Sequence, residues 1–177
     1  MPGIAGIKPI IQFSEENAFL SNFAPAPIKI NGFVWPTVEH VYQAYKATDD
    51  RGREIIRLAT SPNLAKKLGQ TVKLPEDWET KKMVVMKKML EAKFAHGSEL
   101  AQKLLDTKYC YLIEGNTWHD NFWGDCLCWK CTRITGENQL GILLMARRDE
   151  LLSEVTKDTL LSKGYNLEEL EQDNPYG

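Results

Sequence analysis

An Asn31-Gly32 pair stands between two short apolar runs, and it constrains the fold more than any other feature of the chain. Residues 28–30 (Ile-Lys-Ile) precede the pair and residues 33–35 (Phe-Val-Trp) follow it. Asn-Gly between alternating apolar residues is the strongest short-range signal for a β-hairpin, because both residues accept the positive φ of a type I′ turn. We therefore expect a hairpin over residues 28–35.

Helical spacing covers most of the rest of the chain. Thr37 is expected to cap a helix that opens at Pro36-Thr37 and runs to about Thr48. Further helices are expected over residues 53–60, after Ser61-Pro62 to about Gly69, and over residues 76–95, 98–106 and 137–152. Short strands are expected over residues 10–13 and 109–114. The pattern predicts an α+β, helix-dominated single domain over residues 1–177, with a core at about 10–153 and weak helices in a tail at 154–177.

Length, charge and cysteine content exclude several classes of protein. The 177 residues carry a formal charge of −2, whereas a sequence-independent nucleic-acid binder usually has a large basic excess. No apolar run reaches the roughly 18 residues that span a bilayer, and the first eleven residues do not resemble a secretory signal. Four cysteines, three of them crowded between residues 126 and 131, do not resemble a secreted disulfide framework. We expect a cytoplasmic protein.

The helix after the hairpin has two neighbouring stripes. Val38, Val41, Tyr42 and Tyr45 form an apolar stripe, whereas Glu39, Gln43 and Lys46 are spaced i, i+4, i+7 beside it. A carboxylate, an amide and an amine at the edge of a buried face could open onto a cleft. Spacing alone favours an exposed polar row over a site, and His40, elsewhere on the helical wheel, is by itself more typical of a structural histidine.

Residues 115–136 form a long stretch without periodicity, and such stretches inside a compact domain are usually functional. Asp120 lies there among Trp118, Trp123 and Gly124, a composition that suits a flat ligand: indoles stack on a base, and carboxylates hold ribose hydroxyls. The alternative is that the tryptophans only anchor the loop to the core.

The same stretch holds Cys126, Cys128 and Cys131, with His119 close by. Four soft ligands suffice for tetrahedral zinc, but three so close together in sequence strain a tetrahedron, and packing of reduced cysteines is the favoured interpretation. We therefore expect neither a metal nor any other cofactor. A metal-stapled interaction module centred on the cysteines is the structural alternative.

Two further groups could reach a ligand. Ser21, Asn22 and Phe23 form a rigid loop with polar tips beside two prolines, and Trp78 could be a stacking platform or a core anchor. The sequence contains no phosphate-binding glycine loop, HExxH or GxSxG motif, which argues against nucleotide hydrolysis of the P-loop kind, zinc proteolysis and α/β-hydrolase chemistry.

Several of these stretches, in this order, resemble the YbiA/NADAR family over nearly the whole span from Phe13 to Leu152. The matching pieces are Phe19–Pro25, Trp35–Lys46, Leu68-Gly69, Asp77–Glu79, Asp120, Trp123-Gly124 and Gly136–Met145. The resemblance implies a helix-rich α+β fold and an N-glycosidase. It also promotes the Glu39, Gln43 and Lys46 stripe, with Trp78, Asp120 and Trp123, to site residues. The chain departs from the shorter YbiA form at residues 125–135, where a longer loop carries the cysteines.

Two substrate classes follow from that resemblance. The first is ADP-ribose attached to guanine, which would involve transient contact with ADP-ribosylated DNA; the second is the ribosylamino-pyrimidine phosphates of riboflavin synthesis. The longer cysteine loop and the lack of a fused biosynthetic domain favour the first. A non-catalytic ADP-ribose or nucleotide reader would use the same pocket, and the sequence leaves the oligomeric state open.

The chemistry of a ribose C1′–N bond assigns roles to these residues. Cleavage passes through an oxocarbenium-like state, which a carboxylate stabilises while an acid protonates the leaving nitrogen. We expect Glu39, Asp120 and Lys46 to be catalytic, with Lys46 acting as an acid or, if burial lowers its pKa, as an amine that forms a Schiff base. The residues expected to bind substrate are Ser21, Asn22, Phe23, His40, Gln43, Trp78, Trp123 and Gly124.

Overall fold

The computed structural model describes residues 8–131 and 133–163, and it contains the expected hairpin. Strands β1 (Ile28–Ile30) and β2 (Phe33–Trp35) pair antiparallel, with Ile28 opposite Trp35. The two turn residues, Asn31 and Gly32, have φ angles of 51° and 82°, as a type I′ turn requires. The hairpin prediction is therefore confirmed, and the turn fixes which apolar residues of the strands face inward.

Three short helices follow the hairpin: α1 (Val38–Ala44), α2 (Asp50–Arg57) and α3 (Pro62–Gly69). Each is capped by a side chain that accepts a backbone N–H: Thr37 caps α1, Asp49 caps α2 and Ser61 caps α3. The cap at Asp49 starts α2 three residues before the predicted start. α1 ends four residues earlier than predicted, because residues 45–47 continue in a tighter turn in which Lys46 N donates to Gln43 O.

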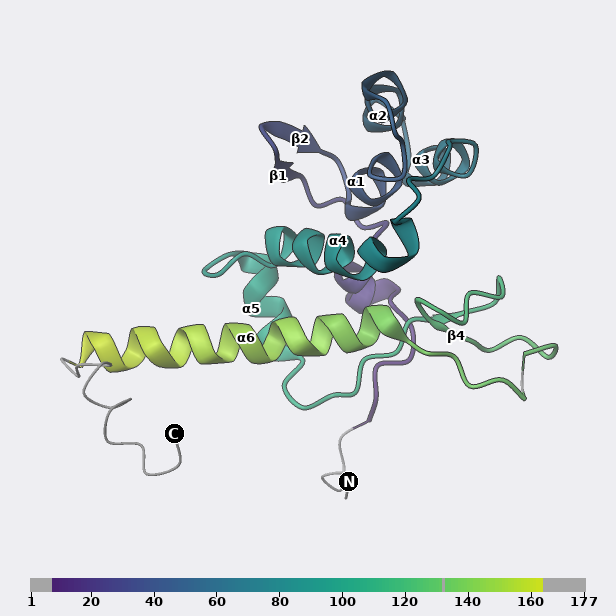
Figure 1. The fold of residues 1–177 in the computed structure, drawn as a ribbon. Helices are drawn as coiled ribbons and strands as arrows, with labels where there is room; N and C mark the ends of the chain where they lie inside the picture. Colours follow the sequence, from purple (N-terminus) through teal and green to yellow (C-terminus); the bar gives the residue numbers. More distant parts are fainter. Residues whose placement is uncertain (1–7, 132, 164–177) are drawn as a thin grey trace.

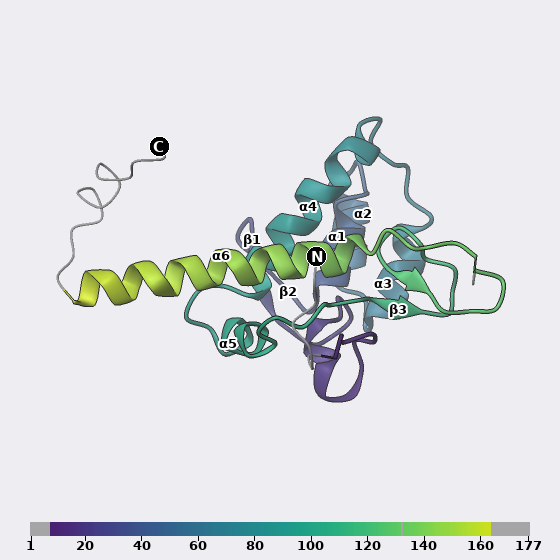
Figure 2. The same cartoon turned by 90° about the horizontal axis from the view of Figure 1, so that it is seen from below.

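The second half contains α4 (Trp78–Lys93), α5 (Glu99–Asp106) and α6 (Gln139–Ser162). α6 packs against both α4 and α5, while α1 lies between α2, α3 and α4 (Figures 1 and 2). The prediction that helix 137–152 gives way to a weakly helical tail is wrong for residues 154–162. α6 continues through them, and Glu154 and Asp158 on this extension both contact His96. Residues 164–177 of the tail lie outside the described residues.

The predicted strands over residues 10–13 and 109–114 are reduced to one parallel bridge, Ile10 to Leu112. Pairing does not extend because Gly115 N donates to Ile113 O at 3.0 Å, and these are the two groups that the next rung of the ladder would use. The side chain of Asn138 binds the opposite edge of the same segment. Its Oδ1 accepts the Glu114 N–H at 3.0 Å, and its Nδ2 donates to Leu112 O at 2.8 Å, so these backbone groups are already satisfied. The stretch over residues 115–136 is irregular, as expected, apart from the two-residue strands β3 (Gly115–Asn116) and β4 (Asp125–Cys126), which pair in parallel.

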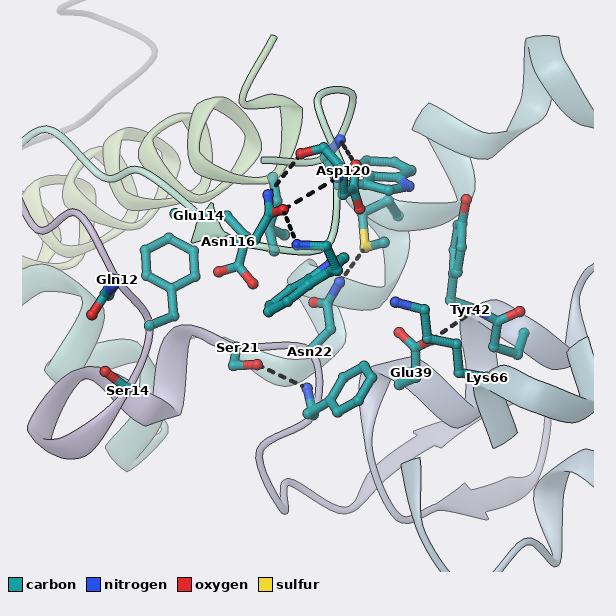
Figure 3. A pocket seen from close by; sticks show the side chains of 18 of the residues that line it. Gln12, Ser14, Ser21, Asn22, Glu39, Tyr42, Lys66, Glu114, Asn116 and Asp120 are labelled. Carbon is teal, nitrogen blue, oxygen red and sulfur yellow. Dashed lines mark hydrogen bonds between the residues drawn. The ribbon is translucent and has the colours of Figure 1, made fainter. Parts of the chain in front are cut away.

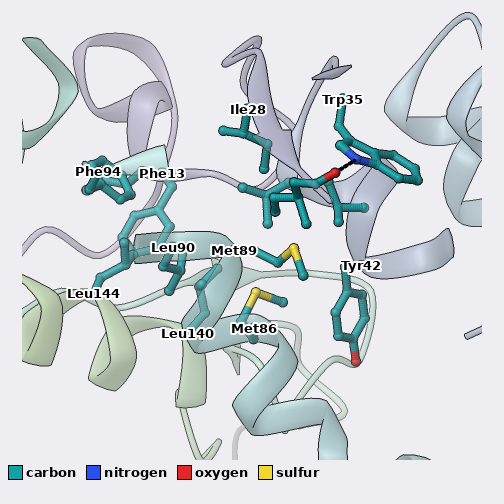
Figure 4. Packing of buried hydrophobic residues seen from close by; sticks show 14 of the residues in the cluster. Phe13, Ile28, Trp35, Tyr42, Met86, Met89, Leu90, Phe94, Leu140 and Leu144 are labelled. Carbon is teal, nitrogen blue, oxygen red and sulfur yellow. Dashed lines mark hydrogen bonds between the residues drawn. The ribbon is translucent and has the colours of Figure 1, made fainter. Parts of the chain in front are cut away.

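A continuous apolar core joins the hairpin to the helices (Figure 4). Ile28 and Trp35 of the hairpin face Met89 of α4, and Phe13 meets Leu144 of α6 in the same cluster. Three residues of the apolar stripe predicted on α1 are buried, with Val38 and Val41 fully inaccessible, whereas Tyr45, just after the helix, is half-buried. No helix in the described ranges is long and apolar enough to cross a membrane.

Candidate active site

A cavity of about 480 Å³ opens where α1, α3, the loop after the 3-10 helix η1 (Glu15–Leu20) and the stretch 114–123 meet (Figure 3). Side chains from these separate elements converge on the same space. The polar residues that line it are Gln12, Ser14, Ser21, Asn22, Glu39, Tyr42, Gln43, Lys46, Lys66, Glu114, Asn116, Thr117 and Asp120. Aromatic walls come from Phe13, Phe23, Trp118 and Trp123.

Glu39 and Gln43 lie one turn apart on α1, and both are almost wholly buried. Gln43 Nε2 donates to Glu39 Oε1 at 2.7 Å. Burial raises the pKa of Glu39 above its ordinary value, while this hydrogen bond and the charges of Lys66 and Lys46 act in the opposite direction. The carboxyl group of Glu39 therefore lies in the poorly solvated wall of the cavity, and the amide of Gln43 fixes its orientation.

Lys46 comes from the tight turn that follows α1, and its Nζ lies 5.0 Å from the centre of the Tyr42 ring and 5.9 Å from that of Trp78. Burial lowers the pKa of Lys46, and the negative charge of Glu39 opposes this effect. The two aromatic rings form the apolar surroundings of the amine. A lysine with a lowered pKa supplies more free amine at neutral pH than an exposed one.

Asp120 reaches the cavity from the irregular stretch, and its own loop holds it in place. Asp120 Oδ1 accepts the backbone N–H groups of Phe122 at 3.2 Å and Trp123 at 2.9 Å. Asn116 on β3 donates from Nδ2 to Asp120 O at 2.7 Å and accepts Asp120 N at Oδ1. One carboxylate oxygen thus organises the turn, and the carboxylate keeps its second oxygen for other partners.

Glu114 places a further carboxyl group at the cavity. Burial raises its pKa to about 7, the charge of Asp120 acts in the same direction, and Lys93 opposes both. Lys93 itself is buried, donates to Ser21 O at 2.7 Å and has a pKa lowered by burial to about 7. A carboxyl group that exchanges its proton near neutral pH is suited to acid–base chemistry.

Three residues that line the cavity carry buried acceptor atoms without a hydrogen-bond partner among the described residues: Asn22 Oδ1, Gln43 Oε1 and Glu114 Oε2. The amide nitrogen of Asn22 donates to Met86 Sδ at 3.5 Å, and Gln43 Oε1 lies against Gly69. Buried acceptors are normally satisfied, so unpaired ones beside a cavity suit a ligand rich in hydroxyl and N–H donors.

Most of the residues predicted from the sequence meet at this cavity. Glu39, Lys46 and Asp120 line it together, so the polar stripe on α1 does not face open solvent. Five of the expected substrate-binding residues are also on its wall. These are Ser21, Asn22, Phe23, Gln43 and Trp123.

Three predicted binding residues do not line the cavity, and each has another role. His40 is buried on the far side of α1, between Thr37 Oγ1 at 2.8 Å and Ala59 O at 3.1 Å. Trp78 packs behind Tyr42, with ring centroids 5.3 Å apart, so it supports the wall and does not offer a free face to a base. Gly124 lies so close to Glu114 that an added Cβ would be 2.1 Å from Glu114 O, which makes it a packing glycine.

Lys66 and Glu114 are the charged wall residues that sequence reasoning missed, together with Asn116 and Tyr42. Lys66 lies on α3, with Nζ 5.7 Å from the ring centres of both Phe23 and Trp118. Its neighbour Lys67 gives the same helical signal, so the sequence alone could not select one. Glu114 had a weak signal, as the single acid at the end of the apolar run over residues 109–114.

The cysteine group lies beside the cavity but does not line it. His119, Cys126, Cys128 and Cys131 are brought together, with one potential ligand atom of each within 4.8 Å of all the others. The loop that departs from the shorter family form therefore folds around a cluster of soft ligands.

Comparison with known proteins places this fold and cavity in an established group. Residues 9–152 match the NADAR domain. N-glycosidase YbiA of Escherichia coli (strain K12) is 42% identical over 143 residues, covering 80% of this chain and 86% of that protein. The riboflavin biosynthesis protein PYRR of Zea mays is 40% identical over 152 residues, covering 76% of this chain and 23% of that protein. The NMR structure of E. coli YbiA superposes with a TM-score of 0.74 at 38% identity, covering 88% of this chain and 96% of that chain.

The fold, the cavity and these relatives define an enzyme that hydrolyses N-glycosyl bonds. The chain belongs to the NADAR family. The resemblance stated from the sequence, the helix-rich α+β fold and the enzyme class are thereby confirmed.

Proposed function

We propose that this chain hydrolyses the ribose C1′–N bond of a phosphorylated ribosyl heterocycle, with Glu39, Asp120 and Lys46 as catalytic residues. The observation that supports this most directly is the meeting of three carboxyl groups and a partly buried amine around one cavity. Aromatic walls suit the heterocycle, and Lys66 suits the phosphate charge.

The carboxyl groups divide the work according to their environments. Departure of the base leaves positive charge on the ribose, which ionised Asp120 or Glu39 stabilises across a water-poor cavity. The leaving nitrogen takes a proton from a carboxylic acid, and Glu114, whose pKa burial raises to about 7, is protonated in a large fraction of molecules at neutral pH. Pairs of carboxyl groups with different pKa values are typical of glycoside-cleaving sites.

Lys46 provides a covalent route through the same cavity. Its Nζ forms a bond to C1′ as the bond to the base breaks, and the base leaves with the electron pair and a proton from the carboxyl side. The attached nitrogen gives one proton to the ring oxygen as the sugar ring opens to a protonated imine. Water hydrolyses this imine to the free aldehyde sugar and the free amine, releasing one proton. The lowered pKa of Lys46 favours this route because only the unprotonated amine attacks.

Two substrates fit this chemistry. The ribosylamino-pyrimidine phosphates of riboflavin synthesis are favoured by relatives named for riboflavin biosynthesis in Zea mays and Vibrio vulnificus. ADP-ribose attached to guanine, with brief contact to ADP-ribosylated DNA, is favoured by the rim of the cavity. Trp118 is 58% exposed there, and Lys66 lies beneath it. An exposed indole over a cation can stack on an extrahelical base.

The proposal is tested by incubating the full chain with each substrate and quantifying the free base by chromatography. Wild-type protein and the Lys67→Ala control should release base from one of the two substrates, whereas Lys46→Ala should not. Borohydride added during turnover should leave a reduced sugar adduct on Lys46, located by mass spectrometry. Binding of both substrates without any base release would instead identify a non-catalytic reader, and full activity of Lys46→Ala would remove the lysine from the mechanism.

A further inference from the structure

We propose that His119, Cys126, Cys128 and Cys131 bind one structural Zn²⁺ ion beside the active-site cavity. None of the four lines the cavity, so this site is separate from the glycosidase chemistry and does not depend on the proposed function. Two of the four are buried, Cys126 and Cys131. The sequence made packing of reduced cysteines the favoured interpretation, and the geometry reverses that preference.

The distances among the four ligand atoms fit a tetrahedral ion. His119 Nδ1 lies 3.3 Å from Cys131 Sγ, 3.3 Å from Cys128 Sγ and 4.0 Å from Cys126 Sγ. With Zn–N near 2.0–2.1 Å and Zn–S near 2.3 Å, a regular tetrahedron separates nitrogen from sulfur by about 3.6 Å. All four atoms fall within 4.8 Å of one another. Packing of reduced cysteines does not require one imidazole nitrogen to face three sulfurs at these distances, whereas metal binding does.

The backbone holds the three cysteines so that small side-chain movements would complete a tetrahedral site. Cys131 N donates to Cys128 O at 3.0 Å, so the C-x-x-C segment forms the tight turn in which both thiols face one side. Cys126 is fixed separately on β4, where its N–H donates to Asn121 Oδ1 at 3.0 Å. The sequence suggested that three cysteines so close together would strain a tetrahedron. The structure avoids this strain because a strand supplies one cysteine and a turn supplies the other two.

His119 completes the set from an unusual backbone conformation. Its φ is 67°, in the left-handed region that is unfavourable for a non-glycine residue. Such conformations persist where the surroundings over-determine them, often at functional sites. Here the conformation directs Nδ1 toward the three sulfurs, which leaves Nε2 as the nitrogen that carries the proton when a metal is bound.

The donor set selects zinc. Three thiolates and one imidazole in a tetrahedron are typical of structural zinc, whereas magnesium and calcium prefer oxygen ligands. Binding one Zn²⁺ releases three thiol protons and leaves the site with one net negative charge, with no change in oxidation state. No oxidant or further ligand is needed, because the four protein atoms close the coordination sphere.

A metal here would hold a segment that has little core of its own. The described parts of the loop expose Trp129 by 79%, Ile134 by 55% and Leu127 by 49%. The first ligand, His119, is directly followed by Asp120, whose backbone also binds Asn116 on β3. The ion would therefore fix one side of the segment that delivers a carboxylate to the cavity, and the Asn116 side chain fixes the other.

The direct test is metal content. The full chain, purified under reducing conditions without a polyhistidine tag, should contain about one zinc per molecule by mass spectrometry of the metals, as a four-ligand structural site holds one ion. Cys128→Ser and Cys131→Ser should lose most of it. Cys110→Ser is the matched control, because Cys110 lies outside the cluster, and it should keep the full amount.

Cobalt substitution supplies a spectroscopic check that does not depend on activity or on any variant folding. Metal-free wild-type protein titrated with Co²⁺ should develop the intense visible bands of tetrahedral cobalt and thiolate charge transfer, saturating at one equivalent and bleaching on addition of Zn²⁺. Thiol titration should show three protected cysteines until a chelator is added. Zinc content no higher in wild-type protein than in Cys128→Ser, weak octahedral cobalt bands, or a disulfide among the three cysteines would each overturn the proposal.

Discussion

Gln43 Nε2 donates a 2.7 Å hydrogen bond to Glu39 Oε1 inside α1, where both side chains are almost fully buried. The bond opposes the effect of burial on the pKa of Glu39, which is the largest influence on that carboxyl group. Behind the pair lies Gly69 of α3, where any Cβ would stand 2.1 Å from Gln43 Oε1. Three residues from two helices therefore set the orientation and the charge of one carboxylate.

Replacing Gln43 should alter the pH dependence of the enzyme as well as its rate. In Gln43→Leu the hydrogen bond that lowers the pKa of Glu39 is lost, so the acid limb of the kcat/KM profile should move to higher pH. The rate at neutral pH should fall by roughly 10-fold, against roughly 10³-fold for Glu39→Gln, which removes the charge itself. Gln43→Glu would add a second buried acid and should be worse than Gln43→Leu. If the acid limb of kcat/KM does not move in Gln43→Leu, ionisation of Glu39 is not the cause of that limb.

Gly69→Ala should reproduce the Gln43 defect from the neighbouring helix. The added methyl cannot coexist with the Gln43 side chain, so either the side chain leaves Glu39 or α3 shifts, at a cost of about 1–3 kcal/mol in the free energy of unfolding. Gly52→Ala on α2 is the matched control, because its Cβ would lie 3.2 Å from Ala47 Cβ and its nearest contacts include no residue that lines the cavity. Thermal unfolding and kcat/KM of both variants check this. Equal stability and equal kcat/KM of the two variants would show that the close contact between Gly69 and Gln43 does not matter for the enzyme.

The fold was predictable where local chemistry decides it. Asn31-Gly32 fixed the hairpin, and Thr37 and Ser61 marked the starts of their helices. The strands expected at 10–13 and 109–114 were wrong because β propensity does not reveal that Gly115 N would turn back onto Ile113 O, the acceptor that further pairing needs. Helix ends also escaped prediction, since the extension of α6 is accompanied by contacts to His96.

The candidate site was predictable where one element supplies neighbouring groups. Helical spacing alone put Glu39 beside Gln43, and the resemblance to relatives raised that stripe from an exposed row to a site. Tertiary packing decided the rest: Lys66 and Glu114 reach the cavity from elements whose local pattern does not single them out, and Trp78 packs against Tyr42. The four residues of the proposed zinc site were visible as a pattern, but their closeness in space depends on the turn and the strand that carry them.

Lys66 should contribute mainly to substrate binding. Its Nζ lies between the Phe23 and Trp118 rings at the edge of the cavity, where it can meet a phosphate without touching the glycosidic bond. Lys66→Ala should raise KM roughly 10-fold and leave kcat within about 3-fold, since it removes binding common to ground and transition states. Lys67→Ala, one residue on and exposed, should match wild type. Steady-state kinetics at two salt concentrations distinguish the Lys66→Ala and Lys67→Ala variants. A large loss of kcat in Lys66→Ala, but not in Lys67→Ala, would show that Lys66 takes part in the chemical step.

The two buried groups with a pKa near 7 should shape the pH dependence of stability in opposite directions. Glu114 has a pKa raised from 4.5 to about 7, so its contribution to stability falls by up to about 3 kcal/mol as pH rises through that window. Lys93 has a pKa lowered from 10.5 to about 7, so its contribution rises between pH 7 and 10.5. Urea unfolding across pH should show a minimum near neutrality from this pair. Glu114→Gln should flatten the acidic side of that curve. Because the Glu114 charge raises the pKa of Lys93, the rise on the alkaline side should begin at lower pH in this variant. A slope that persists below pH 7 would assign it to other carboxyl groups.

The same carboxyl group should govern the alkaline limb of catalysis. If Glu114 donates the proton to the leaving nitrogen, only its protonated form is active, so kcat/KM should fall as pH rises through about 7, the pKa to which burial raises it. In Glu114→Gln the amide cannot donate that proton in the same way, so the rate should fall by roughly 10²-fold and the limb near pH 7 should disappear. A substrate analogue with a more acidic leaving base needs less protonation and should recover most of the loss. If the limb stays at the same pH in Glu114→Gln, the proton comes from another group, and Lys46, whose amine must then be protonated, becomes the donor to examine.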